Sequence, residues 1–230
     1  MEEKRHINIQ YDSELREVKE SLIYMGALTE KAIDKGINAL IERNTELARQ
    51  AMVEDDLIDK LDVEIEEKCI RLLALRQPAA RDLRFIATAI KINGHLERIA
   101  DMAVKIAEKA IILNNEPQLK PYIDLPRMAA VARGMIKESL DAFINEDVSL
   151  AEKVRKDDEI IDNLNEQIFR ELLTFMMEEP HTIPRAMIIS QISKSLERIS
   201  DHAKGIADMV IYMVTGTTVR HKFPRVSEEN

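Results

Sequence analysis

The sequence predicts an all-α fold of two pseudo-symmetric three-helix bundles, with six long helices that arise from an internal repeat. Composition is one reason, because the 230 residues include only 6 Gly and 7 Pro and are rich in helix-favouring residues such as Leu, Ala, Glu and Lys. The repeat is the other reason. Residues 96–108 read LERIADMAVKIAE and residues 196–208 read LERISDHAKGIAD, with eight of these thirteen positions identical.

A second pair of segments shows that the repeat extends beyond this phrase. Residues 54–65 (EDDLIDKLDVEI) align with residues 157–168 (DDEIIDNLNEQI), which gives the repeat a period of about 100 residues. We therefore expect a first bundle over residues 1–118, a second bundle over residues 119–216, and a loose tail over residues 217–230.

Three helices are expected in the first repeat, and each boundary has a local signal. Asp12 or Ser13 can cap the first helix, and Asn44 and Thr45 provide a turn and a new cap for the second. Pro78 ends the second helix, because the residue before a proline is kept out of the helical region, and it suits the first position of the third helix. The expected helices are therefore about 12–42, 45–76 and 78–113.

The second repeat follows the segment NNEPQLKPYIDLP (114–126), which is the richest in helix breakers and is predicted to be a linker. A fourth helix is expected over about 125–144. Ser149 is expected to cap the fifth helix, which continues to the segment MMEEPHTIP. The sixth helix is expected over about 184–214, with Gly216 as its C-terminal stop.

Charge, hydrophobicity and cysteine content argue against nucleic-acid-binding, membrane-spanning and secreted proteins. The formal net charge of −9 argues against nucleic-acid binding, which needs a basic face. No run approaches the length of about 18 apolar residues that a membrane-spanning helix needs, and the N-terminus MEEKRHINIQ lacks the apolar core of a signal peptide. The single cysteine, Cys69, cannot form an internal disulfide and is expected to be a buried thiol. These features predict a cytoplasmic protein that does not insert into membranes.

Paired carboxylates are the candidate functional groups. Residues four apart are neighbours on a helix surface, so Asp55 and Asp59 present their carboxylates together, and Glu97 and Asp101 do so on the next helix. If these two helices pack side by side, both pairs line one shallow channel beside the core. The same double pair occurs in the second repeat, at Asp158, Asp162, Glu197 and Asp201.

Two explanations of the paired carboxylates stay open. Neighbouring Lys and Arg side chains can offset the repulsion and leave a solvated helix face, or metal cations can. All-oxygen ligation suits Mg²⁺, Mn²⁺ and Ca²⁺, and ferric iron equally. Metal binding is favoured because the double pair appears in both repeats. The five histidines are scattered without the spacing of a zinc site, so surface or structural roles are expected for them.

Three longer segments carry a family resemblance. They are QPAARDLRFIATAIKINGHLERIAD (77–101), RELLTFMMEEPHTIPRA (170–186) and LERISDHAKGIADMVIYMVTG (196–216). Together they closely resemble the PhoU family, bacterial regulators of phosphate signalling and transport, over nearly the whole chain except the termini. The resemblance implies two three-helix bundles, in agreement with the reading above. It also implies a non-enzymatic negative regulator that damps the phosphate-starvation response.

The resemblance also implies partners. Members of the family are thought to act between a phosphate-specific ABC transporter, through its ATPase subunit, and a sensor histidine kinase. A homodimer is expected as well, because long helices with exposed apolar edges often pair.

Some PhoU-like proteins carry multinuclear metal clusters on the bundle surface, held by paired E(D)xxxD motifs. The resemblance therefore implies that the eight carboxylates named above are metal ligands, with iron as the metal, or else zinc, manganese, magnesium or calcium. The family usually has Asn four residues after the ExxxD aspartate, where this chain has Lys105 and Gly205. Lys105 is expected to neutralise the first site, which would make the two sites unequal. Glu108 and Asp208 lie on the same face as additional candidate ligands.

An enzyme is the alternative from another class. A surface cluster of metal ions could hydrolyse phosphoesters, because two-metal sites activate water. The chain has no glycine-rich phosphate loop and no Ser/His/Asp pattern, and a bundle wall offers little pocket, so the regulator is preferred.

Overall fold

The computed structural model describes residues 2–219, with side chains from residue 10 onward. This part of the chain is helical and contains no strand, which confirms the predicted all-α class. The last eleven residues of the predicted tail, 220–230, lie outside the described residues. The elements are α1 (Glu2–Ile41), α2 (Thr45–Arg76), α3 (Ala80–Asn114), α4 (Asp124–Asn145), α5 (Val148–Glu178), the short 3₁₀ helix η1 (Pro180–Thr182) and α6 (Ile183–Thr215).

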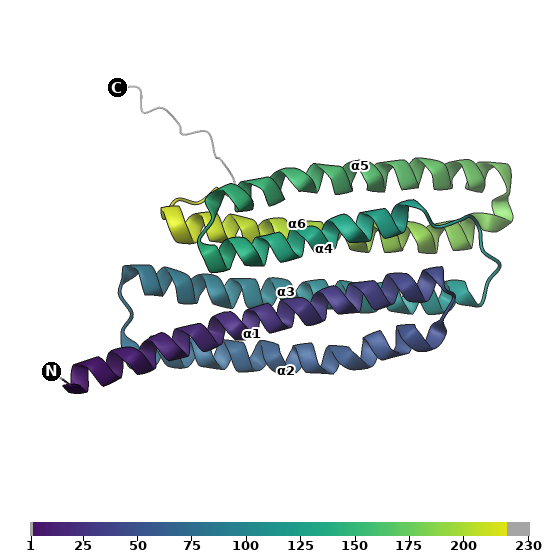
Figure 1. Ribbon diagram of the computed structural model, residues 1–230. Helices are drawn as coiled ribbons and strands as arrows, with labels where there is room; N and C mark the ends of the chain where they lie inside the picture. Colours follow the sequence, from purple (N-terminus) through teal and green to yellow (C-terminus); the bar gives the residue numbers. More distant parts are fainter. Residues whose placement is uncertain (1, 220–230) are drawn as a thin grey trace, which may run out of the picture.

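The six helices form two layers, as Figure 1 shows. Helices α1, α2 and α3 make one three-helix bundle, and α4, α5 and α6 make the other. The two bundles meet mainly along α3 and α6, which run in opposite directions through the middle of the molecule, and secondarily along α1 and α4. The predicted pair of pseudo-symmetric bundles is thus confirmed, and the doubled phrase lies on the two central helices.

The buried apolar side chains form a single cluster that runs through both bundles. Positions related by the repeat are buried together: Ile58 and Ile161 are each 1% or less exposed, and Leu96 and Leu196 are fully buried. Cys69 is fully buried, as expected. Burial of such side chains from water is the main stabilising contribution to a bundle of this kind, so the repeat is maintained chiefly by its core.

Two glycines allow the bundles to approach each other closely. A Cβ atom on Gly26 of α1 would lie 2.2 Å from Leu140 Cδ1 of α4, and one on Gly205 of α6 would lie 2.5 Å from His95 Cε1 of α3. The ring of His95 in turn meets His202, with their Nδ1 atoms 3.1 Å apart. Two of the histidines predicted to be scattered therefore meet at the interface between the bundles.

The start of α1 corrects the expected cap at Asp12 or Ser13. The helix already begins at Glu2, so both residues lie within it. The segment upstream has no Gly or Pro to stop a helix, and contacts with the rest of the bundle hold the following turns in place. The Tyr11 hydroxyl donates to Asp82 Oδ2 at 3.0 Å, and Arg76 makes a bidentate pair with Glu14 at 2.7 and 3.0 Å.

The other helix boundaries agree with the sequence in part. Asn44 caps α2 by accepting from the Leu47 N–H at 3.1 Å, and Gly216 ends α6 with a φ of 71°, both as predicted. The expected cap at Ser149 is wrong, because Asp147 accepts from the Leu150 N–H at 3.0 Å and α5 begins two residues earlier.

Pro78 also lies outside the helix that it was predicted to begin. Gln77 ends α2 in the left-handed region at φ 45°, and the extended Ala79 is the N-cap residue of α3. The fixed φ of Pro78 therefore falls in the turn between α2 and α3, and the helix begins at Ala80.

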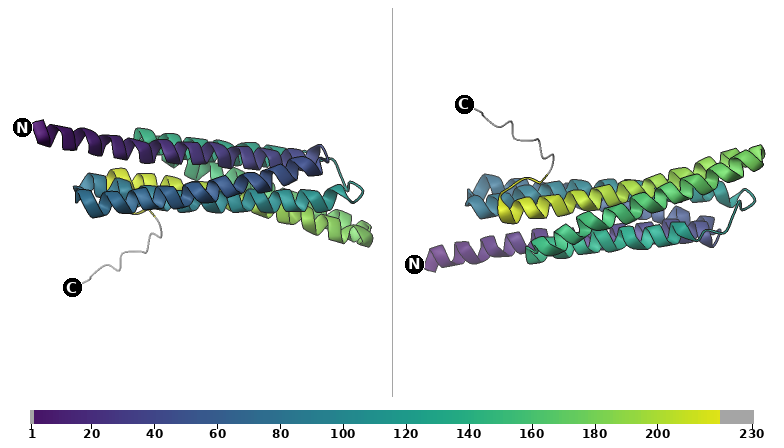
Figure 2. Two further views of the ribbon diagram at one scale, coloured as in Figure 1. Left: turned by 90° about the horizontal axis from the view of Figure 1, so that it is seen from below. Right: turned by 90° about the horizontal axis from the view of Figure 1, so that it is seen from above.

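Helix α1 is much longer than its counterpart α4. Its N-terminal end projects past the second bundle in both views of Figure 2. Residues 12–20 of α1 correspond to residues 115–123 of the second repeat, which form the linker between α3 and α4. Within residues 2–219, none of the helices is both long and apolar enough to cross a membrane.

Candidate metal centres

The first predicted group of carboxylates lies on the wall between α2 and α3, which pack side by side. Asp55 is half-buried, and its Oδ1 atom is buried without a hydrogen-bond partner among the described residues. Burial, followed by the negative charges of Asp59, Asp101 and Glu97, raises the pKa of Asp55 to about 6. The two helices thus bring the four predicted residues together, as the sequence suggested.

Arginine partly neutralises this first wall. The Arg98 guanidinium lies 3.2 Å from Glu97 Oε2 and 3.2 Å from Asp101 Oδ2. The pKa of Glu97 is nevertheless raised, by burial first and by Asp101 second. Negative charge therefore remains in excess around Asp55.

The second group lies on the corresponding wall between α5 and α6. Asp158 is only 3% exposed, and its Oδ2 atom accepts from Lys204 Nζ at 2.5 Å. This hydrogen bond, together with the charges of Asp158, Asp201 and Asp162, raises the pKa of Lys204. A lysine from α6 therefore lies among the predicted ligands of the second wall.

The second wall nevertheless has carboxylate oxygens that accept no hydrogen bond among the described residues. Lys194 Nζ lies 2.7 Å from Glu197 Oε1. The other carboxylate oxygen of Glu197 and Oδ1 of Asp158 are buried without hydrogen-bond partners among the described residues. Buried carboxylate oxygens are costly when left unpaired, so this wall too can accept a further cation or donor.

The predicted asymmetry between the two walls exists, but its cause differs from the prediction. Lys105 is exposed and makes no ion pair among the described residues, so it does not neutralise the first wall. Gly205 is buried and leaves room for the His95 ring. The neutralising lysine is Lys204, on the second wall.

The two additional candidate ligands also differ from each other. Asp208 forms an ion pair with Arg155, whose Nε atom lies 2.8 Å from Asp208 Oδ1. Its carboxylate therefore has a basic partner from α5. Glu108 is exposed on α3.

The donor chemistry of both walls suits a hard cation, although neither wall forms a finished cage. Every predicted ligand is a carboxylate, and three of their oxygens are buried without partners, on Asp55, Asp158 and Glu197. Within residues 10–219, no group of three or more His, Cys, Asp or Glu side chains is arranged to hold one ion. Side-chain rearrangement or bound water would have to complete the coordination.

A small hollow lies beside the first wall, with a volume of about 290 Å³. Asn93 and Asp62 form part of its lining, and the Asn93 amide donates to Asp62 Oδ1 at 2.6 Å. In the second repeat, Ser193 donates to Asn165 Oδ1 at 2.7 Å at the equivalent positions. Both halves therefore have a side-chain hydrogen bond between the two helices of the wall, but a carboxylate, that of Asp62, takes part only in the first half.

The basic partners of the walls were not predicted from the sequence. Arg98 and Lys194 could have been found, since each lies one or three residues from a predicted ligand on the same helix. Lys204 reaches Asp158 across the contact between α6 and α5, so it required the packing of two helices.

Comparison with known proteins gives the family. A PhoU domain matches residues 22–110 and again residues 125–210. A "Phosphate-specific transport system accessory protein PhoU homolog" from Pseudomonas aeruginosa is 42% identical over 226 residues, covering 97% of this chain and 93% of that protein. A protein of the same description from Aquifex aeolicus is 45% identical over 209 residues, covering 91% of this chain and 95% of that protein.

Solved structures agree. The crystal structure of PhoU from Pseudomonas aeruginosa superposes with a TM-score of 0.86 at 42% identity, covering 90% of this chain and all of that chain. The phosphate transport system regulatory protein PhoU from Streptococcus pneumoniae gives a TM-score of 0.86 at 30% identity, covering 92% of this chain and all of that chain. Both halves of the sequence, the arrangement of the six helices and these relatives lead to one conclusion: the chain belongs to the PhoU domain family.

Proposed function

We propose that this protein is a non-enzymatic accessory regulator of phosphate uptake, and that it damps the phosphate-starvation response. The observation that carries the proposal is the PhoU domain in each half of the chain, together with close relatives described as accessory proteins of a phosphate-specific transport system. The protein acts between the ATPase subunit of a phosphate ABC transporter and a sensor histidine kinase, and it does so as a homodimer.

The acidic walls are proposed to bind metal ions. Asp55, Asp59, Glu97 and Asp101 would hold ions on the first wall, and Asp158, Asp162, Glu197 and Asp201 would do so on the second. A bound cation, which would be iron or else zinc, manganese, magnesium or calcium, would supply positive charge where buried oxygens lack partners. Its role in this proposal is to fix the shape and charge of the walls.

The regulatory role is tested by removing the gene and by measuring binding. We expect cells without the protein to express phosphate-starvation genes at high external phosphate. We also expect the purified protein to bind the transporter ATPase subunit or the cytoplasmic part of the sensor kinase. Normal repression in the deletion strain, combined with no binding to either partner at any phosphate level, would refute this role.

The metal sites are tested by elemental analysis of the purified protein. A variant with Glu97→Ala, Asp101→Ala, Glu197→Ala and Asp201→Ala should lose bound metal. The matched control removes four exposed carboxylates elsewhere, through Glu20→Ala, Glu64→Ala, Glu67→Ala and Glu159→Ala, and should retain it. Equal metal content in the two variants, or none in the unaltered protein, would exclude these walls as metal sites.

A further inference from the structure

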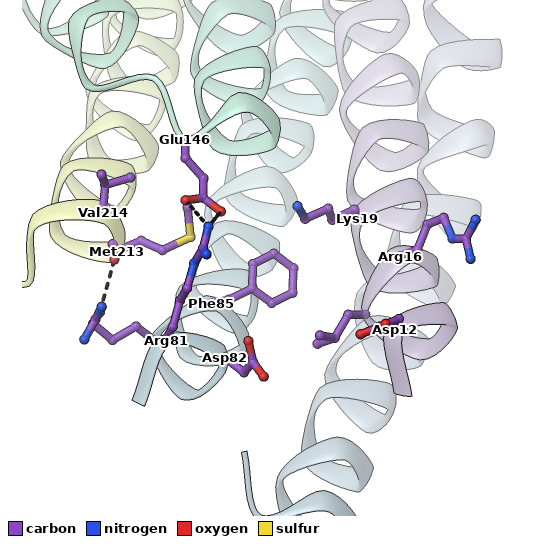
Figure 3. Close-up of a pocket in the computed structure, with 11 residues that line it drawn as sticks. Asp12, Arg16, Lys19, Arg81, Asp82, Phe85, Glu146, Met213 and Val214 are labelled. Atoms are coloured by element: carbon purple, nitrogen blue, oxygen red, sulfur yellow. Dashed lines mark hydrogen bonds and ion pairs between the residues drawn. The ribbon is translucent and has the colours of Figure 1, made fainter. Parts of the chain in front are cut away.

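A pocket lies away from the acidic walls, at the end of the molecule where α1 projects. Its volume is about 560 Å³. Its lining comes from both bundles: from α1, the start of α3, the end of α6 and the turn between α4 and α5 (Figure 3). Val214 on one side and Lys19 on the other show how the pocket spans the two layers.

Two short motifs from the segments that carry the family resemblance, QPAARDLR (77–84) and IYMVTG (211–216), meet in this pocket. The motif QPAARDLR and the next residue contribute Arg81, Asp82, Arg84 and Phe85, and the motif IYMVTG contributes Met213 and Val214. They are joined directly, because Arg84 Nε donates to the Met213 carbonyl oxygen at 3.1 Å. Neither motif takes part in the acidic walls, so the walls do not account for either of them.

The opposite end of the molecule shows what can occupy such a space. Arg43 in the first repeat is equivalent to Glu146 in the second. Each residue follows the first helix of its repeat and has a positive φ, 52° for Arg43 and 55° for Glu146. Arg43 donates to the carbonyl oxygens of Asn114 and Glu116 at 2.7 Å each. Arg185, equivalent to the pocket residue Phe85, donates to the Pro117 carbonyl at 2.8 Å. The residues equivalent to the pocket lining thus bind the main chain of an extended segment, the linker.

The difference in length between α1 and α4 explains why only one end is open. Positions that form the linker in the second repeat form the N-terminal half of α1 in the first. The linker turns toward the bundle, which a straight helix cannot do. The space between α1, the start of α3 and the end of α6 therefore stays open as the pocket.

The lining defines the chemistry of an occupant. Leu15, Phe85 and Met213 provide apolar surface, and Lys19 Nζ lies 5.2 Å from the centre of the Phe85 ring. Four basic side chains exceed three acidic ones in a chain whose net charge is −9. Glu146 accepts from Arg81 at 2.8 Å, and this pair is neutral, which leaves the charges of Arg16, Lys19 and Arg84 against those of Asp12 and Asp82. Positive charge is therefore in excess over an apolar floor.

We propose that this pocket binds an extended acidic segment of a partner protein, with a bulky apolar side chain on the Phe85 surface and carboxylates facing Arg16 and Lys19. The inference rests on the proposed function, because the partner tested is the ATPase subunit of the phosphate transporter. At the opposite end of the molecule arginine side chains bind main-chain carbonyl oxygens, and a pocket for one side chain is a general source of specificity in the recognition of extended segments.

The test measures binding of the full chain to the purified ATPase subunit. An Arg16→Glu/Lys19→Glu variant should bind about tenfold more weakly or worse, and the loss should shrink at high salt, because reversed charges at an interface act through electrostatic attraction. The matched control, Lys60→Glu/Lys156→Glu, reverses two exposed lysines outside the pocket and should bind as the unaltered protein does. Circular dichroism and thermal unfolding check that both variants are folded.

A photo-crosslinking residue in place of Val214 identifies the occupant. The expected product joins this position to an acidic segment of the ATPase subunit. Equal affinity of the two double variants would overturn the pocket proposal while leaving the regulatory role intact, and so would a crosslink from position 214 to residues 220–230 of the same chain. Absence of binding by the unaltered protein would instead remove both this inference and the partner on which it rests.

Discussion

At the scale of single residues, one lysine makes the two acidic walls unequal. Lys204 lies 2.5 Å from the buried Asp158, whereas the first wall has Val104 at the equivalent position. An ammonium group held among carboxylates supplies the positive charge that a cation would otherwise supply. The first wall is therefore the stronger candidate for a metal site.

Removing this lysine should make the second wall a better cation site. In a Glu97→Ala/Asp101→Ala background, which disables the first wall, Lys204→Ala should raise the affinity for Mn²⁺ at least about tenfold, because one opposing unit charge is lost. Calorimetric titration measures this affinity. Lys105→Ala is the control, because Lys105 is exposed and unpaired within the described residues, and should change nothing. An unchanged Mn²⁺ affinity on Lys204→Ala would contradict the assignment of Lys204 as the neutralising group.

Gly205 and His95 form a complementary pair at the interface of the bundles. Gly205→Ala would place a Cβ atom 2.5 Å from His95 Cε1, so we expect it to lower the free energy of unfolding by about 1–3 kcal/mol in urea titrations. Gly134→Ala is the control, because a Cβ there has nothing within 4 Å, and it should stabilise α4 by about 0.5–1 kcal/mol. His95→Ala should relieve part of the Gly205→Ala cost. Strictly additive effects would show that the two residues do not interact.

The same interface should make stability sensitive to acid. Burial, and after it the positive charges of Arg98 and Arg198, lowers the pKa of His202 below its ordinary value. At this histidine the unfolded chain binds more protons than the folded one, so the contribution of His202 to stability is complete above a pH of about 6.5 and is lost as the pH drops below it. Asp55, whose pKa is raised to about 6, contributes in the opposite sense over the same range, so the effect of His202 is measured as a difference: between pH 7.5 and 5.5 the unaltered protein should lose more, or gain less, unfolding free energy than a His202→Gln variant. A His202→Gln variant with an unchanged pH slope would contradict this cause.

At the scale of helices, the N-termini of α2 and α5 show which local features decide where a helix begins. Asn44 and Asp147 occupy equivalent positions, and each accepts from the backbone N–H three residues ahead, at 3.1 and 3.0 Å. Each follows a residue with positive φ, Arg43 or Glu146, that ends the preceding helix. The turn geometry therefore selects the cap, and a serine two residues further on is already inside the helix.

Cap substitutions test this assignment. Asp147→Ala and Asn44→Ala should each lower the free energy of unfolding by about 1 kcal/mol, because each leaves a terminal N–H without its side-chain acceptor. Ser149→Ala, a change within the helix, should cost at most a few tenths of a kcal/mol. Chemical denaturation of the three variants measures these values. A Ser149→Ala loss equal to that of Asp147→Ala would restore the cap predicted from sequence.

The six helices could be predicted because the periodic apolar residues and the repeated sequence each lie within a single helix, so no knowledge of helix packing was needed. Ile99 and Ile199, for example, occupy the same position of the doubled phrase, and both are buried. Boundaries at Pro78 and Ser149 were missed because two acceptable signals lie within two residues of each other. Lys204 and the pocket were missed for a different reason. Each depends on which helices pack together, and residues up to 129 positions apart, such as Arg84 and Met213, meet only in the fold.

At the scale of the whole molecule, the two bundles are tied together as one unit. Their cores merge, and ion pairs cross the interface between Arg133 and Asp34 and between Arg81 and Glu146. The pocket uses side chains from both layers, and the walls share α3 and α6 with the interface. A change in how the bundles pack would therefore reach both the pocket and the walls.

This coupling predicts that neither bundle opens alone. Cys69, the single cysteine, is fully buried in the first bundle, and Leu172 is fully buried at the equivalent position of the second. Thiol labelling under native conditions gives the free energy of the opening that exposes each site. The second thiol is Leu172→Cys in a Cys69→Ala background. For each thiol, the opening free energy is subtracted from the global unfolding free energy of the same protein. We expect the two differences to agree within about 0.5 kcal/mol. Gly205→Ala, at the interface, should lower both opening free energies equally. A thiol in one bundle that became exposed at a much lower free energy than the other would show that the bundles unfold separately, in spite of their shared core.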